Sequence, residues 1–259
     1  MSRNSVLEGN SSVQDTQQHI LAVALRLMQT GGYHAFSYAD VAAEVGITKA
    51  SIHYHYPSKA DLGTAGLRQY RVWWRTQVHG LTAPSGTPSG PPVPVSGSGV
   101  PGIRNTSAGH PDTAALLRSY SRVYRDMLRG GRICLVAALA PESLLLPQSM
   151  QAELRGFYTE HTSWLQEVLE SGRATGDVTA PGPLRVQAQA LLSALHGAQG
   201  LARVQGDVYR YCAVAHLTLA GLGLPFTELE ISDPAAFEAQ NLDTQNPAAE
   251  PSESGLTFA

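Results

Sequence analysis

The chain has few cysteines and no long apolar run, and both absences exclude whole classes of protein. Two cysteines among 259 residues are too few for a disulfide framework and fit a reducing compartment. No stretch approaches the roughly 20 uncharged apolar residues that a membrane-spanning helix needs. Residues 1–10 are polar and lack the apolar segment of a secretory signal. Hydrophobic residues make up 43% of the chain, which is enough for a packed core. Because the sequence predicts neither a membrane helix nor a signal segment, we expect a soluble cytoplasmic protein.

Enzyme and metal-site signatures are also missing. The sequence has no glycine-rich phosphate loop, no Gly-x-Ser-x-Gly, no His-Glu-x-x-His and no clustered acidic pair. Cys212 and His216 share a helix face, but two ligands are too few for structural zinc, and we assign the pair to a buried dimer face. His53 and His55 point apart on a helix. We predict no catalytic activity, no cofactor and no metal.

The net charge of −3 is a property of the C-terminal end. Residues 225–259 hold seven acidic residues and no Lys or Arg. Without them, 18 basic residues stand against 14 acidic ones, a net charge of +4. The first 80 residues hold seven basic and five acidic residues and five of the nine histidines. The overall acidity therefore does not argue against binding phosphate groups.

Composition and helix signals divide the chain into five segments. Pro, Gly, Ser and Thr dominate a segment in the middle of the chain. Because these residues cannot form a hydrophobic core, we expect the segment to be a disordered linker. Strand signals are essentially absent, so we predict an all-α protein. The predicted segments are a flexible arm (1–14), a helix-turn-helix DNA-binding domain with a connecting helix (15–80), the linker (81–111), a ligand-binding and dimerisation bundle (112–224) and an acidic tail (225–259).

Four helix starts with their own cap signals fall in the first 60 residues. Capping boxes begin at Asp15, Ser37 and Ser58, and Thr48 can cap a third, short helix. We expect the first helix to end at residues 31–32, where two glycines can take left-handed conformations. The spacing predicts a helix-turn-helix over residues 37–59.

The C-terminal segment predicts a bundle of helices. They span about 111–129, 133–139, 147–171, 183–205 and 208–223, with prolines at several starts and glycines at several ends. The last two carry small and apolar residues on one face, as helix-packing faces do. The residues of that face are Ala188, Leu191, Leu192, Leu195, Ala198 and Ala202.

The short helix after Gly46 has the residues that a major-groove helix needs. Small side chains let the backbone approach DNA, and Lys49 can contact a base edge or a phosphate. Hydroxyl groups at helix N-termini can donate hydrogen bonds to phosphates, and Lys59 at the start of the next helix can bind a phosphate by its charge. Tyr54 can equally well pack against the protein or contact a phosphate. A plain small bundle with ordinary surface histidines is the alternative. The predicted DNA contacts are Ser37, Tyr38, Thr48, Lys49, Ala50, Ser51, His53, Tyr54, His55 and Lys59.

Residues from about 16 to 67 resemble the TetR family of bacterial transcriptional regulators. The resemblance lies in the run Val-Gly-Ile-Thr-Lys-Ala-Ser-Ile-His-Tyr-His-Tyr-Pro-Ser-Lys-Ala-Asp-Leu and in the order of a small domain followed by a bundle. It implies a homodimer on a palindromic operator and a C-terminal pocket whose ligand releases the DNA. Most members have an aromatic residue where this chain has His53, so the family role is not carried over there.

Cys134 lies in a second, shorter resemblance. The segment Arg-Ile-Cys-Leu from Arg132 is similar to the Gly-Cys-Leu segment of a TetR subgroup that responds to electrophiles or small unsaturated acids, with Ile in place of Gly. A thiol near Arg132 could have a lowered pKa and react as a thiolate. The alternative, which we favour, is that Cys134 is a small buried apolar residue.

Aromatic and histidine side chains of the bundle suggest a pocket for an aromatic or amphipathic small molecule. Each is also a reasonable core residue when taken singly. The predicted ligand-binding residues are Tyr120, Tyr124, Cys134, Phe157, His161, Trp164 and His196.

The sequence therefore predicts a ligand-responsive repressor that dimerises through the last two helices of the bundle. Alternatives are an activator or a ligand-independent regulator, and a helical adaptor that binds proteins through the Ala/Leu face. A small-molecule enzyme is a distant third, because no catalytic residue can be named.

Overall fold

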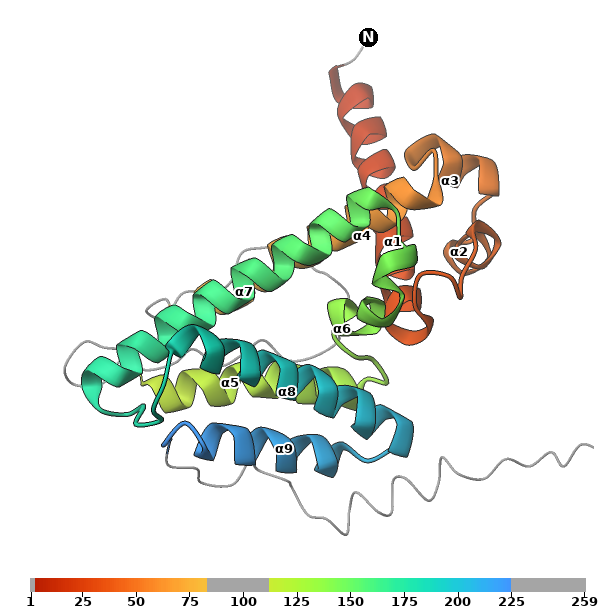
Figure 1. Ribbon diagram of the computed structural model, residues 1–259. Helices are drawn as coiled ribbons and strands as arrows, with labels where there is room; N and C mark the ends of the chain where they lie inside the picture. Colours follow the sequence, from red (N-terminus) through yellow and green to blue (C-terminus); the bar gives the residue numbers. More distant parts are fainter. Residues whose placement is uncertain (1–2, 83–111, 225–259) are drawn as a thin grey trace, which may run out of the picture. The chain divides into compact units, whose positions relative to one another are not determined.

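The computed structural model describes residues 3–82 and 112–224, and these residues are helical with no strand (Figure 1). The predicted all-α class is confirmed. The linker (81–111) and the acidic tail (225–259) fall almost wholly outside the described residues. The helices are α1 (Arg3–Gly31), α2 (Tyr38–Val45), α3 (Lys49–His55), α4 (Lys59–Thr82), α5 (Thr113–Arg129), α6 (Leu135–Leu139), the 3-10 helix η1 (Ala140–Leu145), α7 (Gln148–Thr175), α8 (Leu184–Gln205) and α9 (Val208–Ala220).

The helix-turn-helix forms through the local signals expected of it. The Ser37 side chain and Asp40 make a reciprocal capping box at the start of α2. Gly46 takes φ 77°, the left-handed conformation that lets the chain turn between α2 and α3. The Thr48 hydroxyl accepts the Ser51 N–H at 3.2 Å and caps α3. Each helix end therefore satisfies its own backbone groups, and this fixes the orientation of α3.

The expected start of the first helix is wrong. α1 begins at Arg3, twelve residues before the Asp15 capping box. A cap contributes only about 1 kcal/mol, and a potential cap inside a helix does not stop the helix when the preceding residues can continue it. Residues 3–14 contain one glycine and no proline. One face of α1 packs into the core, because Leu21, Ala24, Leu25 and Met28 are all buried.

Gly172 acts differently from the sequence interpretation. We expected the helix to end at Gly172, but α7 continues to Thr175 and ends at Gly176, which has φ 85°. A Cβ on Gly172 would lie 2.7 Å from side-chain atoms of Thr113 and Val178, so this glycine allows close packing inside the helix. The predicted end of the short helix at residue 139 is confirmed, because α6 ends at Leu139 and the 3-10 helix η1, with Pro141 in its first turn, follows directly.

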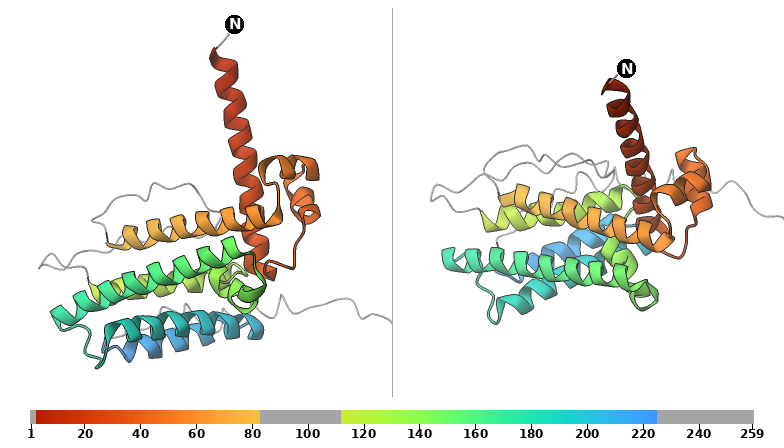
Figure 2. Two further views of the ribbon diagram at one scale, coloured as in Figure 1. Left: turned by 45° about the horizontal axis from the view of Figure 1, so that its top comes forward. Right: turned by 90° about the horizontal axis from the view of Figure 1, so that it is seen from above.

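The C-terminal bundle is formed by α5, α7, α8 and α9, and α8 and α9 lie side by side (Figure 2). The Ala/Leu face of α8 is buried inside the protomer. It is therefore a helix-packing face, as expected, but it is not available to a protein partner. The adaptor hypothesis, which needed this face exposed, is wrong in that form.

Candidate DNA interface and aromatic core

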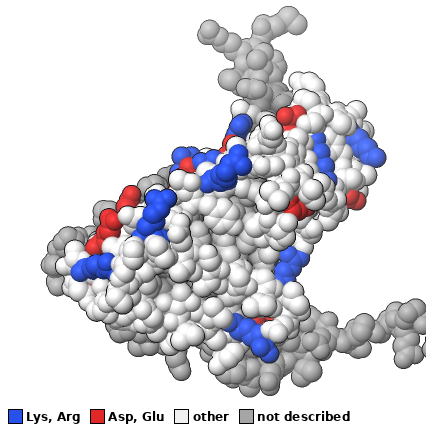
Figure 3. Space-filling model, viewed as in Figure 1, with Lys and Arg blue, Asp and Glu red and all other residues white. Residues whose placement is uncertain are grey.

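Helix α3 presents an exposed polar face, which we call the recognition face. Thr48, Lys49, Ala50, His53 and Tyr54 are exposed on it, and Tyr54 keeps 78% of its surface in solvent. Ile52, on the opposite side, is fully buried and anchors the helix to the domain. Basic and acidic side chains both lie over the α2–α3 region of the surface (Figure 3), and the positive charge on α3 itself is Lys49. The face combines small residues, hydrogen-bonding groups and positive charge, which is what a groove-binding helix requires.

Other predicted DNA contacts near the recognition face are half-buried, or their side chains form hydrogen bonds within the domain. Ser51 and His55 are half-buried, and the Thr48 and Ser51 hydroxyls lie 3.0 Å apart. Ser37 is exposed at the start of α2, and its hydroxyl donates to Asp40. The Ser37 and Thr48 hydroxyls are thus engaged in capping α2 and α3.

Tyr38 and His53 hold each other in place at the edge of the recognition face. The Tyr38 hydroxyl donates to the Tyr56 carbonyl at 2.8 Å, and its ring lies edge-on to His53 with 4.7 Å between centroids. Burial, helped by the charge of Asp61, raises the pKa of Tyr38 to about 12. His53 Nδ1 is 3.1 Å from the Pro57 carbonyl. The Tyr38 hydroxyl is thus engaged in positioning α3, a role that the sequence did not indicate.

Lys59 is turned toward the protein. Its ammonium group donates to the Phe36 carbonyl and lies 4.3 Å from the Phe36 ring centroid and 4.7 Å from that of Tyr33. Burial lowers its pKa. In this conformation Lys59 ties the start of α4 to the loop between α1 and α2, so its expected grip on a phosphate needs a different side-chain conformer.

The seven predicted ligand residues come from four places in the fold. Tyr120 and Tyr124 lie on α5, Phe157, His161 and Trp164 on α7, His196 on α8, and Cys134 just before α6. Six of the seven pack into one cluster: the Tyr120 and Tyr124 hydroxyls are 2.8 Å apart, Phe157 stacks on His161 with 3.7 Å between centroids, and His196 lies 5.4 Å from Tyr124. Trp164 packs at the edge, 5.1 Å from Tyr120.

Sequence reasoning missed the centre of this cluster. Trp74 of α4 is fully buried and contacts the rings of Tyr120, Tyr124, Phe157 and His161. The signal was present, because α4 carries Tyr70, Trp73 and Trp74 at helical spacing, but the helix was assigned only to the DNA-binding domain. We call the set Trp74, Tyr120, Tyr124, Phe157, His161 and His196 the aromatic core.

Cys134 is a buried structural residue. Its side chain is inaccessible, its backbone N–H donates to Gln199 Oε1 at 3.0 Å, and burial raises the pKa of its thiol. The interpretation of a thiol activated by Arg132 is wrong for this geometry, because desolvation dominates. Cys212 is likewise buried inside the protomer, at 4% exposure, and is therefore not part of a dimer face. Among the described residues, no three His, Cys, Asp or Glu side chains come together as a metal site.

We predict that Cys134 is protected from alkylation in the native protein. A thiol with a raised pKa and no solvent access reacts slowly, because the thiolate is the nucleophile. Iodoacetamide at neutral pH, followed by mass spectrometry, should modify Cys134 only after unfolding in guanidinium. Rapid modification of the folded protein, together with loss of electrophile-induced DNA release in Cys134→Ser, would establish the sensor alternative instead.

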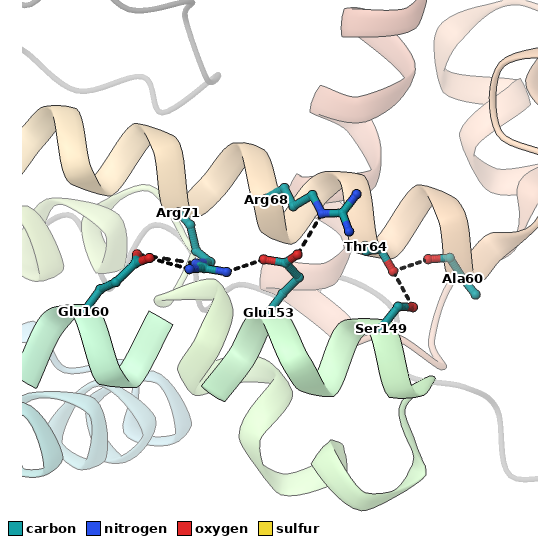
Figure 4. A network of polar contacts seen from close by, with 7 residues as sticks. All are labelled: Ala60, Thr64, Arg68, Arg71, Ser149, Glu153 and Glu160. Atoms are coloured by element: carbon teal, nitrogen blue, oxygen red, sulfur yellow. Dashed lines mark hydrogen bonds and ion pairs between the residues drawn. The ribbon is translucent and has the colours of Figure 1, made fainter. Parts of the chain in front are cut away.

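An ion-pair network joins α4 to α7 (Figure 4). Arg71 pairs with both Glu153 and Glu160, and Arg68 Nε donates to Glu153 Oε1 at 2.7 Å. We call these four residues the arginine clamp. A Cβ on Gly156 would lie 2.6 Å from the Arg71 guanidinium, so this glycine makes the space in which the clamp closes.

The clamp is accompanied by further contacts between the two parts of the protomer. One helical turn or more from it, the Thr64 and Ser149 hydroxyls lie 2.8 Å apart. Tyr70 accepts the Leu135 N–H through its hydroxyl, and Gln29 donates to the Ile133 carbonyl. Helices α1 and α4 of the DNA-binding domain are therefore both hydrogen-bonded to the segment that leads into α6.

Comparison with known proteins agrees with this architecture. The family described as bacterial regulatory proteins, tetR family, matches residues 20–65. A TetR-family transcriptional regulator from Agrobacterium tumefaciens is 30% identical, with 81% of this chain and 98% of that chain covered and a TM-score of 0.68. A TetR transcriptional regulator from Legionella pneumophila is 27% identical, over 79% of this chain and 95% of that chain, with a TM-score of 0.60.

One further relative matches a short segment of the sequence, and another is similar in fold alone. The HTH-type transcriptional regulator AcrR of Shigella flexneri is 43% identical over 49 residues, which are 19% of this chain and 23% of AcrR. The chain thus matches about a quarter of the length of that relative. The reduced form of Escherichia coli NemR, at 19% identity, shares the fold over 82% of this chain and 100% of its own, with a TM-score of 0.62.

A helix-turn-helix joined to a helical bundle defines the class of DNA-binding transcriptional regulators. By its match over nearly the whole length of the Agrobacterium protein, the chain belongs to the TetR family. Within the described residues, no helix has the length and apolarity that crossing a membrane requires.

Proposed function

We propose that the protein is a cytoplasmic homodimeric repressor that binds a palindromic operator through α3 and is released by a small molecule. The recognition face carries this proposal. Its exposed side chains, Lys49 and Tyr54 above all, are held on a helix that Ile52 and two caps fix in place. Five of the ten predicted contact residues lie on this face, and Lys59 needs the conformer change described above. Two such helices, one per subunit, would lie about one DNA turn apart, ~34 Å.

The exposed face of α8 and α9 supports the proposed dimer. Val186, Leu201 and Val204 on α8 and Tyr209 and Leu217 on α9 are 53–86% exposed, and we call them the apolar stripe. The surface over α8 carries few charged side chains (Figure 3). Exposed apolar residues along two adjacent helices favour association with the same surface of a second copy. This is the opposite face to the buried Ala/Leu face.

The arginine clamp supports the proposed coupling between ligand and DNA. Helix α4 begins at the recognition module and contributes Trp74 to the aromatic core, with Arg71 between the two. A ligand that enters the core and displaces Trp74 or α7 must also disturb the clamp. It releases DNA if it binds better to the conformation in which the two recognition helices are wrongly spaced.

Operator affinity measured with and without candidate ligands tests this function. The salt concentration must be fixed, because phosphate contacts make affinity salt-dependent. Fluorescence anisotropy with the DNA upstream of the gene should show tight binding that a ligand weakens. Tight binding that no ligand changes would make the protein a ligand-independent regulator, and absence of any specific binding would contradict the proposal.

Opening the clamp should uncouple ligand from DNA. In Arg71→Met we expect operator affinity within a few-fold of wild type but a ligand effect that falls toward none, because α4 no longer follows α7. Gly156→Ala should act in the same way, since its Cβ would displace the guanidinium without changing any charge. Anisotropy titrations with and without ligand measure both quantities, and Arg155→Met, an exposed arginine on α7, is the control. An unchanged ligand effect in both clamp variants would contradict the coupling.

The clamp also predicts the sign of a pH effect on stability. Partial burial alone would raise the pKa of Glu153, but hydrogen bonds and charges from Arg68 and Arg71 hold that pKa below its ordinary value. The stabilisation from this carboxylate is therefore complete above the glutamate pKa of the unfolded chain and is lost as the pH falls through the lowered value.

A further inference from the structure

Two histidines of the aromatic core have a ring nitrogen with nothing to bind. Nε2 of His161 and Nε2 of His196 are buried and have no hydrogen-bond partner in the structure. His161 is 4% exposed and comes from α7, and His196 comes from α8. Nε1 of Trp74 is the third unpaired nitrogen of the cluster, and because buried polar atoms in native proteins are nearly always paired, the three need an explanation.

The hydrogen bond at Nδ1 of His161 determines whether Nε2 of the same ring is a donor or an acceptor. Nδ1 lies 3.1 Å from the Phe157 carbonyl oxygen, and a carbonyl can only accept. Nδ1 therefore carries the ring proton. In a neutral imidazole the second nitrogen is then an acceptor, so Nε2 of His161 presents a lone pair to the core.

Both rings are neutral at physiological pH. Burial lowers the pKa of His161 to about 4 and that of His196 to about 3, and the proximity of His161 lowers that of His196 further. Arg71, the cation whose charge lowers the pKa of His161, is already paired with two carboxylates. The core thus offers an acceptor at His161, an unpaired N–H donor at Trp74 and aromatic faces, and no free positive charge for an anion.

The surroundings of the two nitrogens are flat and aromatic. His161 stacks on Phe157 and lies edge-on to Trp74, and His196 lies 5.4 Å from Tyr124 and 5.8 Å from Tyr158. Tyr158 is only half-buried, so the cluster reaches the surface there. A planar molecule that replaces part of this packing finds ring faces on several sides, the unpaired Nε2 acceptor of His161 and the unpaired Nε1–H donor of Trp74.

We propose that the effector is an uncharged aromatic molecule with a hydroxyl or N–H donor, of the phenol class, and that it donates a hydrogen bond to Nε2 of His161. Nε2 of His196 lies in the same cluster as a second polar anchor. The inference rests on the proposed function, since it names the ligand class of that same core. His161 follows Glu160 of the arginine clamp on α7 and contacts Trp74 of α4. A ligand bound to His161 would therefore change the positions of residues that form the clamp.

Matched probes separate hydrogen bonding from shape. 4-Methylphenol, 4-methylanisole and benzoate present the same ring with a donor, with no donor and with a negative charge. By calorimetry with the full-length dimer we expect 4-methylphenol to bind at least tenfold more tightly than either of the others. In His161→Phe this preference should vanish, whereas in His19→Phe, on the exposed surface of α1, it should remain.

A spectroscopic measurement keeps the test independent of the variants. In wild-type protein labelled with ¹⁵N-histidine, Nε2 of His161 should resonate as an unprotonated nitrogen and shift on addition of 4-methylphenol but not of 4-methylanisole. Equal binding of the two probes, preference for benzoate, or an unshifted Nε2 that is satisfied by a resident water would overturn the inference. Operator binding by the same protein is measured separately, so a regulator with another ligand class would be recognised as such.

Discussion

Replacing Lys49 and Tyr54 together with alanine should reduce operator affinity about a thousandfold while the dimer stays intact. Both side chains lie on the recognition face and neither contributes to the buried core. A good contact to a base edge contributes roughly 1–3 kcal/mol. A dimer loses four such contacts, and at the lower limit this is about 4 kcal/mol, or roughly a thousandfold in affinity.

Anisotropy titration at fixed salt measures the loss, and light scattering after gel filtration measures the dimer. Arg155→Ala is the control, because it removes an exposed positive charge from α7, away from α3. If the double variant bound operator like wild type, the recognition face would not be the DNA-reading surface. A similar loss in Arg155→Ala would show that only net charge matters.

The second large effect concerns the dimer. Leu201→Glu combined with Leu217→Glu should give a folded monomer that no longer binds the operator tightly. Both leucines belong to the apolar stripe and are 63% and 74% exposed in the protomer. The change should cost the protomer little, but a dimer would have to bury four carboxylates without partners, which is strongly unfavourable.

A matched control is available on η1. Leu144 and Leu145 are 90% and 75% exposed and lie outside the apolar stripe, so Leu144→Glu with Leu145→Glu should leave the dimer intact. Sedimentation velocity gives the masses, and circular dichroism confirms that both variants are folded. A dimer that survives the α8–α9 substitutions, or one that dissociates equally in the η1 control, would contradict this placement of the interface.

The local features of the DNA-binding domain could be predicted because they depend on neighbours in the sequence. Capping at Ser37, Thr48 and Ser58 and the left-handed Gly46 each involve residues within a few positions of one another. The start of α1 was misjudged because a cap signal marks where a helix can begin and not where it must. The DNA-contact roles of the ten residues remain predictions.

The features that connect the two parts of the protomer could not be predicted. Arg71 and Glu153 are 82 positions apart, and nothing in the sequence pairs them. The inward turn of Lys59 depends on Phe36, and the raised pKa of the Cys134 thiol depends on the depth of its burial. Trp74 at the centre of the aromatic core belongs to a helix that begins in the DNA-binding domain, so dividing the chain into segments hid its position.

The central claim is that a dimer reads DNA through two copies of α3. Selection of bound sequences from a random duplex pool, with wild-type protein and the Lys49→Ala, Tyr54→Ala variant in parallel, tests it most directly. We predict that the wild type enriches an inverted repeat whose half-sites are centred about one helical turn apart, ~34 Å, and that the variant enriches nothing. Failure to enrich any motif, or enrichment of the same motif by the variant, would contradict the claim.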